Sequence, residues 1–253
     1  MKTMDDLRNL FLQALQQETD YLKKELPSHL FAIINGYLQG GGKRLRPCLL
    51  LMCAQAVGGD VEKALPAAVA VEEFHTWTLI HDDVIDHDDF RRGNPTGHIL
   101  GSRLGKEAWK LSDTIAADYG ISAAILAGDS LQARATEKLF ELKDFQPQTI
   151  LSLVSNMTGL LTQDLLAGEQ LDVEMSHMAW DRMGGGKVTD ECLVAVTVAG
   201  TQVEIAMRDT NIEAGTAHEV EERHRVTSPA DSEEHPLPVG NQMLLANVGY
   251  ELL

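Results

Sequence analysis

Between residues 79 and 98 the chain reads LIHDDVIDHDDFRRGNPTGH, an apolar run that ends in carboxylates and is followed at once by two arginines. If the run is helical, Asp82 and Asp86 lie four residues apart on one face, with Asp83 beside them. Carboxylates at this spacing repel each other unless a cation lies between them, and Mg²⁺ is usually held by one or two carboxylates together with substrate phosphates. A solvated acidic helix end is the plainer interpretation, but it explains neither the apolar residues between the acids nor the arginines.

Two basic segments supply the cations that phosphate binding would need. Arg91 and Arg92 follow the aspartates directly, and their guanidinium forks match phosphate oxygens. Upstream, the glycines at 40–42 break the chain and allow a close approach of the backbone to a ligand. Lys43 and Arg46 come next, at the mouth of a predicted helix, where the macrodipole also favours an anion.

His75 lies seven residues before Asp82, which is two helical turns and therefore the same face of the predicted helix. A histidine in an apolar helix is either a core or surface residue or a member of a binding site. Its position on the aspartate face keeps the second interpretation open.

The composition narrows the class of protein. The chain has 253 residues, with 21 basic against 38 acidic side chains and a net charge of −17, which argues against nucleic acid as a partner. Its three cysteines lack the C-x-x-C spacing, so we expect reduced thiols and a cytoplasmic protein. The N-terminus is charged and periodic rather than a signal peptide, and no apolar run approaches the roughly 20 residues of a membrane span.

Hydrophobic periodicity predicts a succession of helices. It marks residues 4–26, 30–38, 66–86, 119–142 and 147–175. Residues 48–57 are apolar nearly all round, which is typical of a buried helix. In the helix over 119–142 we expect Ile121, Ile125, Leu126, Leu131 and Leu139 on the apolar side. An acid within 168–172 would face either the first aspartate cluster or solvent.

Several of these segments together resemble the polyprenyl synthetase (trans-isoprenyl diphosphate synthase) family. They are Gly41-Gly42-Lys43-Arg44-Leu45-Arg46-Pro47, His81-Asp82-Asp83-Val84-Ile85-Asp86 and Arg91-Arg92-Gly93-Asn94-Pro95-Thr96. Two further stretches, residues 125–129 and 164–169, are similar to later helices of that family. The resemblance covers about residues 1–176.

The resemblance implies an all-α fold, an isoprenoid-synthase-like bundle of long helices around a central cavity, usually as a homodimer. It also implies the Mg²⁺-dependent, head-to-tail condensation of isopentenyl diphosphate with an allylic diphosphate. In such enzymes the allylic C–O bond ionises, the isopentenyl double bond attacks the allylic cation, and a proton is lost to pyrophosphate.

The roles of the family's residues carry over to matching positions. Asp82 and Asp86 would bridge Mg²⁺ to the leaving diphosphate, with Asp83 in support. Arg91 would hold the allylic diphosphate. Isopentenyl diphosphate brings no metal of its own, and the groups that would hold it are Lys43, Arg46, His75 and Arg92.

In this family the residues about one turn before the first aspartate motif cap the product pocket. Here they are Phe74, Trp77 and Thr78. The indole of Trp77 fills space that a small residue would leave open, which predicts a short product, C15 to C20. Ordinary core packing of a tryptophan is the alternative.

The C-terminal part departs from the family. Its second aspartate-rich motif and the preceding Lys-Thr pair are not recognisable, and residues 192–208 read instead as a β-hairpin. We therefore expect a prenyl synthase-like helical core over 1–176 and a divergent region over 177–253 that completes or replaces the rest of the bundle. Divergence, truncation and alteration of that region all remain open. The alternative function is a catalytically inactive or partner-dependent diphosphate-binding subunit, paired with a full-length synthase.

Overall fold

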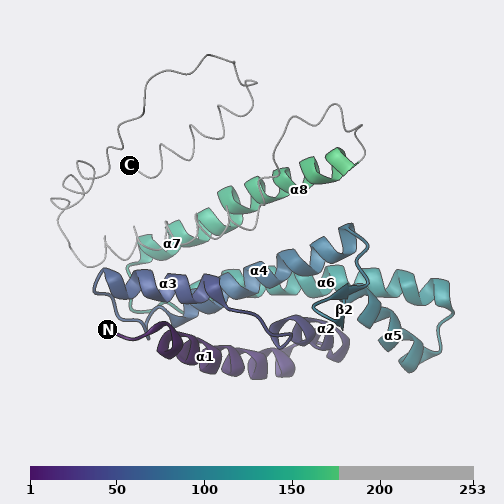
Figure 1. Cartoon of the computed structure of the whole chain (residues 1–253), viewed down its shortest axis with the longest axis horizontal. Helices are drawn as coiled ribbons and strands as arrows, with labels where there is room; N and C mark the ends of the chain where they lie inside the picture. Colours follow the sequence, from purple (N-terminus) through teal and green to yellow (C-terminus); the bar gives the residue numbers. More distant parts are fainter. Residues whose placement is uncertain (177–253) are drawn as a thin grey trace, which may run out of the picture. The chain divides into compact units, whose positions relative to one another are not determined.

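The computed structural model describes residues 1–176, which are almost entirely helical (Figure 1). The helices are α1 (Met4–Glu25), α2 (Ser28–Leu38), α3 (Leu45–Ala56), α4 (Leu65–Ile85), α5 (Gly97–Trp109), α6 (Asp113–Leu139), α7 (Pro147–Ser155) and α8 (Thr162–Ser176). The all-α fold is confirmed for this part of the chain. The predicted β-hairpin and the whole predicted region 177–253 lie outside the described residues. None of the helices within 1–176 is both long enough and apolar enough to cross a membrane.

Helix α1 begins at a capping box. The Thr3 hydroxyl accepts the Asp6 N–H at 3.2 Å, and the Asp6 carboxylate accepts the Thr3 N–H at 2.9 Å. Leu7, Phe11 and Leu15 follow at intervals of four residues and are buried. The sequence periodicity therefore gave the correct buried face for this helix.

Helix α3 corrects one expectation. It is buried on one side only: Cys48 and Leu51 are fully buried, whereas Leu49 and Met52 are 40 % and 41 % exposed. The helix packs against α1 and α4. An all-round apolar sequence therefore overstated its burial, because the described part of the chain covers only one face of it.

Helix α4 positions the aspartates. It contacts α1, α2, α3, α5 and α6, and every residue from 67 to 71 is buried. Its first half is rich in alanine and valine, so neighbouring helices can approach it closely. The aspartates at its C-terminal end are therefore carried by a well-packed helix.

A tight hairpin follows α4. Strands β1 (Phe90–Arg91) and β2 (Asn94–Pro95) pair antiparallel through the two residues between them. Arg92 and Gly93 both have positive φ, 52° and 81°, as a type I′ turn requires. The Arg91 side chain of this hairpin bonds to the aspartates at the end of α4, whereas the Arg92 side chain bonds to the Gly41 carbonyl.

Helix α6 also corrects an expectation. Its buried side combines small residues, including Ala123, Ala124 and Ala127, with Leu131 and Leu139, which the sequence assigned correctly. The other three residues of the predicted apolar side are exposed. The exposed fractions are 39 % for Ile121, 41 % for Ile125 and 55 % for Leu126. Small side chains face the core because α4 and α5 lie close to α6. A Cβ on Gly120, for example, would lie 2.1 Å from the His98 carbonyl oxygen of α5.

The helix predicted over 147–175 is interrupted by a π-helical segment. Residues Asn156–Leu161 (η1) join α7 to α8, and the backbone stays helical throughout. The Thr162 hydroxyl donates to the Met157 carbonyl five residues earlier at 2.7 Å. That bond satisfies a carbonyl that the wider π turn would leave without an ordinary helical partner.

A buried network of charges joins α1 to α6. Arg134 donates to both carboxylate oxygens of Glu18, at 2.7 and 3.0 Å, and to Glu141 at 2.7 Å. Lys138 also donates to Glu18, at 2.6 Å. Glu73 of α4 is fully buried near these groups, and within residues 1–176 neither of its carboxylate oxygens has a hydrogen-bond partner. Burial, reinforced by the charge of Glu18, raises the pKa of Glu73 well above its ordinary value.

Candidate active site

Three aspartates end α4, and the structure gives them unequal environments. Asp83 is fully buried, Asp82 is half-buried, and Asp86 is an exposed C-cap residue. The Asp86 N–H donates to the Asp82 carbonyl at 2.8 Å, so these two residues stand one turn apart as predicted. Asp83, expected only to support them, is the most enclosed of the three.

Asp83 connects four segments of the chain. One oxygen accepts the Tyr37 hydroxyl at 2.5 Å, and the other accepts Nε of Arg91 at 2.7 Å. The Tyr37 oxygen in turn accepts the Gly97 N–H at 2.9 Å. Burial, together with the Asp83 carboxylate, raises the pKa of Tyr37, so the hydroxyl stays protonated and remains a donor. Through these bonds α2, α4, β1 and the start of α5 are fixed to one another.

Arg91 lies directly on the aspartates. Besides the bond to Asp83, its Nη2 donates to Asp82 at 2.6 Å. The pKa of Asp82 is raised to about 6, mainly because the carboxyl group is partly buried. The positive charge of Arg91 opposes this rise, and the negative charges of Asp86 and Asp83 add to it. The carboxylates therefore repel one another, and Arg91 occupies the place that a cation would take.

The basic residues predicted from two separate segments converge near His75. Burial lowers the pKa of His75 to about 3, and the positive charges of Arg46, Arg92, Arg91 and Arg44 lower it further. His75 is therefore neutral at physiological pH, and its Nε2 lies 3.2 Å from Nη1 of Arg46. Because a guanidinium can only donate, that imidazole nitrogen is the acceptor.

The hairpin and the glycine loop are joined by a direct bond. Nη1 of Arg92 donates to the Gly41 carbonyl at 2.7 Å. A Cβ on Gly42, whose φ is +141°, would lie 2.8 Å from the same guanidinium. The absence of a side chain at Gly42 thus leaves room for the Arg92 guanidinium. Lys43, the next residue, is exposed.

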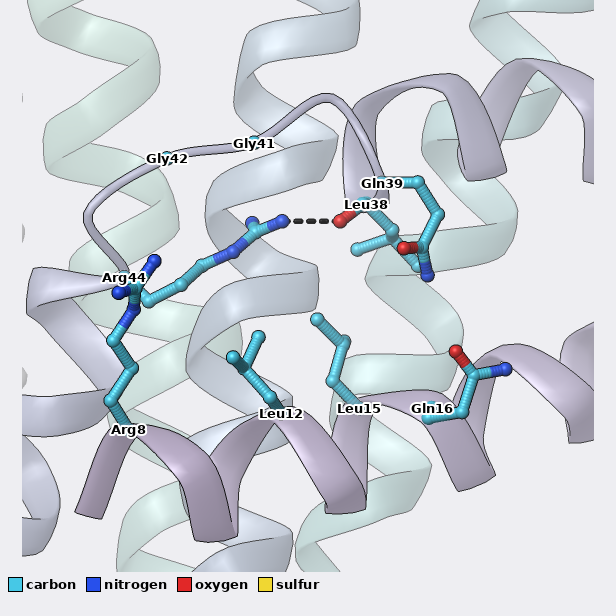
Figure 2. Close-up of a pocket in the computed structure, with 9 residues that line it drawn as sticks. All are labelled: Arg8, Leu12, Leu15, Gln16, Leu38, Gln39, Gly41, Gly42 and Arg44. Atoms are coloured by element: carbon cyan, nitrogen blue, oxygen red, sulfur yellow. Dashed lines mark hydrogen bonds between the residues drawn. The ribbon is translucent and has the colours of Figure 1, made fainter. Parts of the chain in front are cut away.

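A cavity of about 260 Å³ lies between α1 and the glycine loop (Figure 2). Its walls come from residues 8–16 of α1 and from residues 38–44. Arg44 is part of the wall, but it donates to the Glu72 carboxylate and to the Leu38 carbonyl. No aspartate of α4 lines this cavity, so it is distinct from the cluster of Asp82 and Arg91.

An acidic residue of α8, Asp172, is exposed, but its charge acts on one of the aspartates. Burial raises the pKa of Asp86, and the charges of Asp88 and Asp172 raise it further. Asp172 belongs to α8, more than eighty residues away along the chain. Asp172 is therefore solvent-exposed, and its negative charge helps to raise the pKa of Asp86.

A magnesium ion suits these residues only in company with a phosphate. Among residues 1–176, no three His, Cys, Asp or Glu side chains come close enough to hold a metal by themselves. Mg²⁺ commonly takes one or two carboxylates and completes its shell with water and substrate phosphates. Asp82 and Asp86, one turn apart and mutually repelling, offer two carboxylates of the kind that such a site would use.

The family model for polyprenyl synthetase matches residues 27–189. The chain belongs to the polyprenyl synthetase family. It is 37 % identical over 158 residues to a geranylgeranyl pyrophosphate synthase of Geoglobus acetivorans, which covers 62 % of this chain and 43 % of that protein. It is 36 % identical over 155 residues to a farnesyl diphosphate synthase of Geobacillus stearothermophilus, covering 59 % and 46 %.

A solved structure of the geranylgeranyl pyrophosphate synthetase from Geoglobus acetivorans matches with a TM-score of 0.59 at 33 % identity. The match covers 79 % of this chain and 58 % of the other. This polyprenyl synthetase family chain therefore has the helical fold of its relatives. Its matches to the curated proteins span about half the length of each of those proteins.

The residues expected to limit product length do not share one environment. Phe74 and Trp77 are 2 % and 4 % exposed, with their rings 5.1 Å apart in an edge contact. Thr78 is half-buried, and its hydroxyl donates to the His75 carbonyl at 2.8 Å. The two aromatic rings belong to the core of this polyprenyl synthetase chain, so core packing is established for them and a role in product length stays a prediction.

Replacing Tyr37 by phenylalanine should lower the free energy of unfolding by about 1–3 kcal/mol, because buried Asp83 loses a donor and the Gly97 N–H loses its acceptor. Urea unfolding measures this change. Tyr21→Phe is the matched control, since the Tyr21 hydroxyl has no hydrogen bond within residues 1–176, and it should shift stability by at most about 0.5 kcal/mol. Equal effects of the two substitutions would refute the role assigned to Tyr37.

Proposed function

We propose that the chain condenses isopentenyl diphosphate head-to-tail with an allylic diphosphate, in a Mg²⁺-dependent reaction, to give a short-chain prenyl diphosphate of C15 to C20. The observation that supports this best is the convergence of opposite charges from separate segments. Arg91 bonds to Asp82 and Asp83 of α4, and it acts on His75 together with Arg46 and Arg92. The named relatives, which are geranylgeranyl and farnesyl diphosphate synthases, support the same reaction.

In this proposal Asp82 and Asp86 hold Mg²⁺, which when bound supplies Lewis-acid stabilisation of the leaving diphosphate. The guanidinium of Arg91 is then released from the two aspartates and holds the allylic diphosphate. Its present bonds keep it within reach of the same position. Asp83 stays bonded to Tyr37, which keeps α4 joined to α2 and to the start of α5.

Isopentenyl diphosphate is proposed to bind the basic residues around His75. Lys43, Arg46 and Arg92 supply the positive charge. His75 adds none, because its pKa is lowered to about 3. Its proposed contribution is to fix the Arg46 guanidinium through the 3.2 Å contact.

A second candidate function is a diphosphate-binding subunit that needs a full-length synthase as partner. It is favoured by the unrecognised second aspartate-rich motif. Each metal-held contact is worth several kcal/mol, and about 1.4 kcal/mol is tenfold in rate, so loss of one metal-binding wall would lower turnover by orders of magnitude.

The test uses the full chain with Mg²⁺, isopentenyl diphosphate and dimethylallyl, geranyl or farnesyl diphosphate. We expect longer prenyl diphosphates by mass spectrometry, and we expect Asp82→Asn to weaken Mg²⁺-diphosphate binding at least tenfold in calorimetry. Asp89→Asn is the matched control, because within residues 1–176 this exposed neighbour is hydrogen-bonded only through its backbone carbonyl.

The outcomes separate the two candidates. Product from the chain alone supports the synthase. Diphosphate binding without product, with turnover appearing on addition of a full-length synthase, supports the subunit. A folded chain that binds no Mg²⁺-diphosphate contradicts both.

A further inference from the structure

The cavity between α1 and the glycine loop contains a positive charge that no other group of residues 1–176 neutralises. Arg8 extends from α1 toward the start of α3, and within those residues its guanidinium has neither an ion pair nor a hydrogen bond (Figure 2). Burial raises the pKa of the Cys48 thiol in the first turn of α3, and the positive charge of Arg8 opposes that rise. The Arg8 guanidinium is therefore available to bind an anion beside that turn.

The second arginine of the cavity is already neutralised. Arg44 is buried, and its guanidinium donates to the Glu72 carboxylate and to the Leu38 carbonyl. Among residues 1–176 the cavity is lined by no acidic side chain. The one guanidinium that remains presents a planar fork, which matches a single carboxylate. A ligand with two negative charges, such as a phosphate monoester, would bring one charge more than Arg8 can neutralise.

Beyond Arg8 the cavity is lined by leucines. Leu15 and Leu38 are buried, and Leu12 is 37 % exposed. Figure 2 shows Leu12 and Leu15 between Arg8 at one end and two glutamine side chains at the other. An aliphatic tail that covers the leucines removes apolar surface from water, which favours binding. The glutamines limit the length of that apolar stretch.

The volume of the cavity sets an upper limit on the size of a ligand. Pockets that hold drug-sized molecules measure roughly 300–1,000 Å³, so a cavity of about 260 Å³ suits a smaller molecule. At about 30 Å³ for each water-sized group, it has room for roughly nine heavy atoms, which is the size of a medium-chain carboxylate.

The cavity is separate from the residues assigned to the two diphosphates. Gly41 and Gly42 line it, and the Gly41 carbonyl also accepts the bond from Arg92. Arg92 itself does not line the cavity, and neither does Lys43 or Arg46. A ligand beside Arg8 would therefore contact the glycine loop without occupying the place of a diphosphate.

We propose that this cavity binds a small monocarboxylate, with its carboxylate paired to Arg8 and a short aliphatic tail lying over Leu12, Leu15 and Leu38. The protein carries a net charge of −17, so it repels anions in general, and an anion that binds needs local positive charge of this kind. The site is independent of the proposed function.

The test measures the binding of hexanoate to the full protein by calorimetry. Hexylammonium has the same tail with a positive head, and acetate has the same head without the tail. Hexanoate should bind at least tenfold more tightly than either. Arg8→Gln, which removes the charge of an exposed side chain, should weaken hexanoate binding at least fivefold. Leu12→Ala should weaken it at least twofold and leave acetate binding unchanged.

Arg103→Gln is the matched control, because Arg103 is exposed, does not line the cavity and has no ion pair within residues 1–176. It should leave hexanoate binding unchanged, and saturating Mg²⁺ with inorganic pyrophosphate should leave it within twofold. Displacement of hexanoate by pyrophosphate would place it at the diphosphate residues and overturn the inference. Hexanoate that binds no more tightly than acetate or hexylammonium, or equally well to Arg8→Gln, would overturn it too.

Discussion

Arg134→Met should lower the free energy of unfolding by about 3–5 kcal/mol, because it leaves the Glu18 carboxylate buried with only one of its two cations. Glu18 is 2 % exposed and accepts two bonds from Arg134 and one from Lys138. These bonds lower the pKa of Glu18 despite its burial, so the carboxylate is ionised. Methionine replaces the length of the arginine side chain but not its charge.

Urea unfolding at neutral pH measures the change. Arg103→Met is the control, since Arg103 is exposed and has no ion pair within residues 1–176, and it should change stability by no more than about 0.5 kcal/mol. Adding Glu18→Leu to Arg134→Met should recover most of the loss, because no unpaired carboxylate then remains in the core. A loss below about 1 kcal/mol in the single variant would mean that the Arg134–Glu18 pair stabilises the fold no more than an exposed salt bridge does.

Glu73 should make the protein less stable as pH rises, by up to about 1.4 kcal/mol per pH unit. Its pKa is raised in the folded state, so the folded chain holds a proton that the unfolded chain has released. The protonated carboxyl is compatible with burial below the unfolded pKa, and stability is lost as pH increases toward the folded pKa. The charged groups that act on it are Glu18, Arg134, Lys138 and Glu141.

The measurement compares wild type with Glu73→Gln in urea at pH 5, 6, 7 and 8. The difference between the two isolates Glu73 from other titrating groups. It should grow in favour of the glutamine variant at higher pH, since an amide of the same shape carries no charge to be ionised. Parallel pH profiles for the two proteins would show that Glu73 has an ordinary pKa.

The local features of the fold were readable from the sequence. The ends of α1 and α4, the glycine break before α3 and the spacing of Asp82 and Asp86 follow from helix caps, breakers and a period of 3.6 residues. These signals act over a few residues. They placed the aspartates on one helix and the arginines in the turn that follows.

The same reasoning failed where neighbouring helices decide which face is buried. The large residues Ile121, Ile125 and Leu126 were assigned to the core, yet alanines and glycines of α6 face α4 and α5. Close packing between helices favours small side chains at the contact. A prediction from hydrophobicity gives alanine and glycine little weight, so it assigned the larger residues to the buried face. The π turn in 156–161 likewise has no periodic signal.

The sequence alone determined the helical class, the family and the residues from which a metal–diphosphate site can be built, because those depend on short-range order and motif spacing. Tertiary structure decided how these residues are connected. Tyr37 meets Asp83 across 46 residues, Arg134 meets Glu18 across 116, and His81 meets Ile125 across 44. Such contacts arise only when helices pack, since no local pattern specifies which side chain of a distant helix will face a buried donor or acceptor.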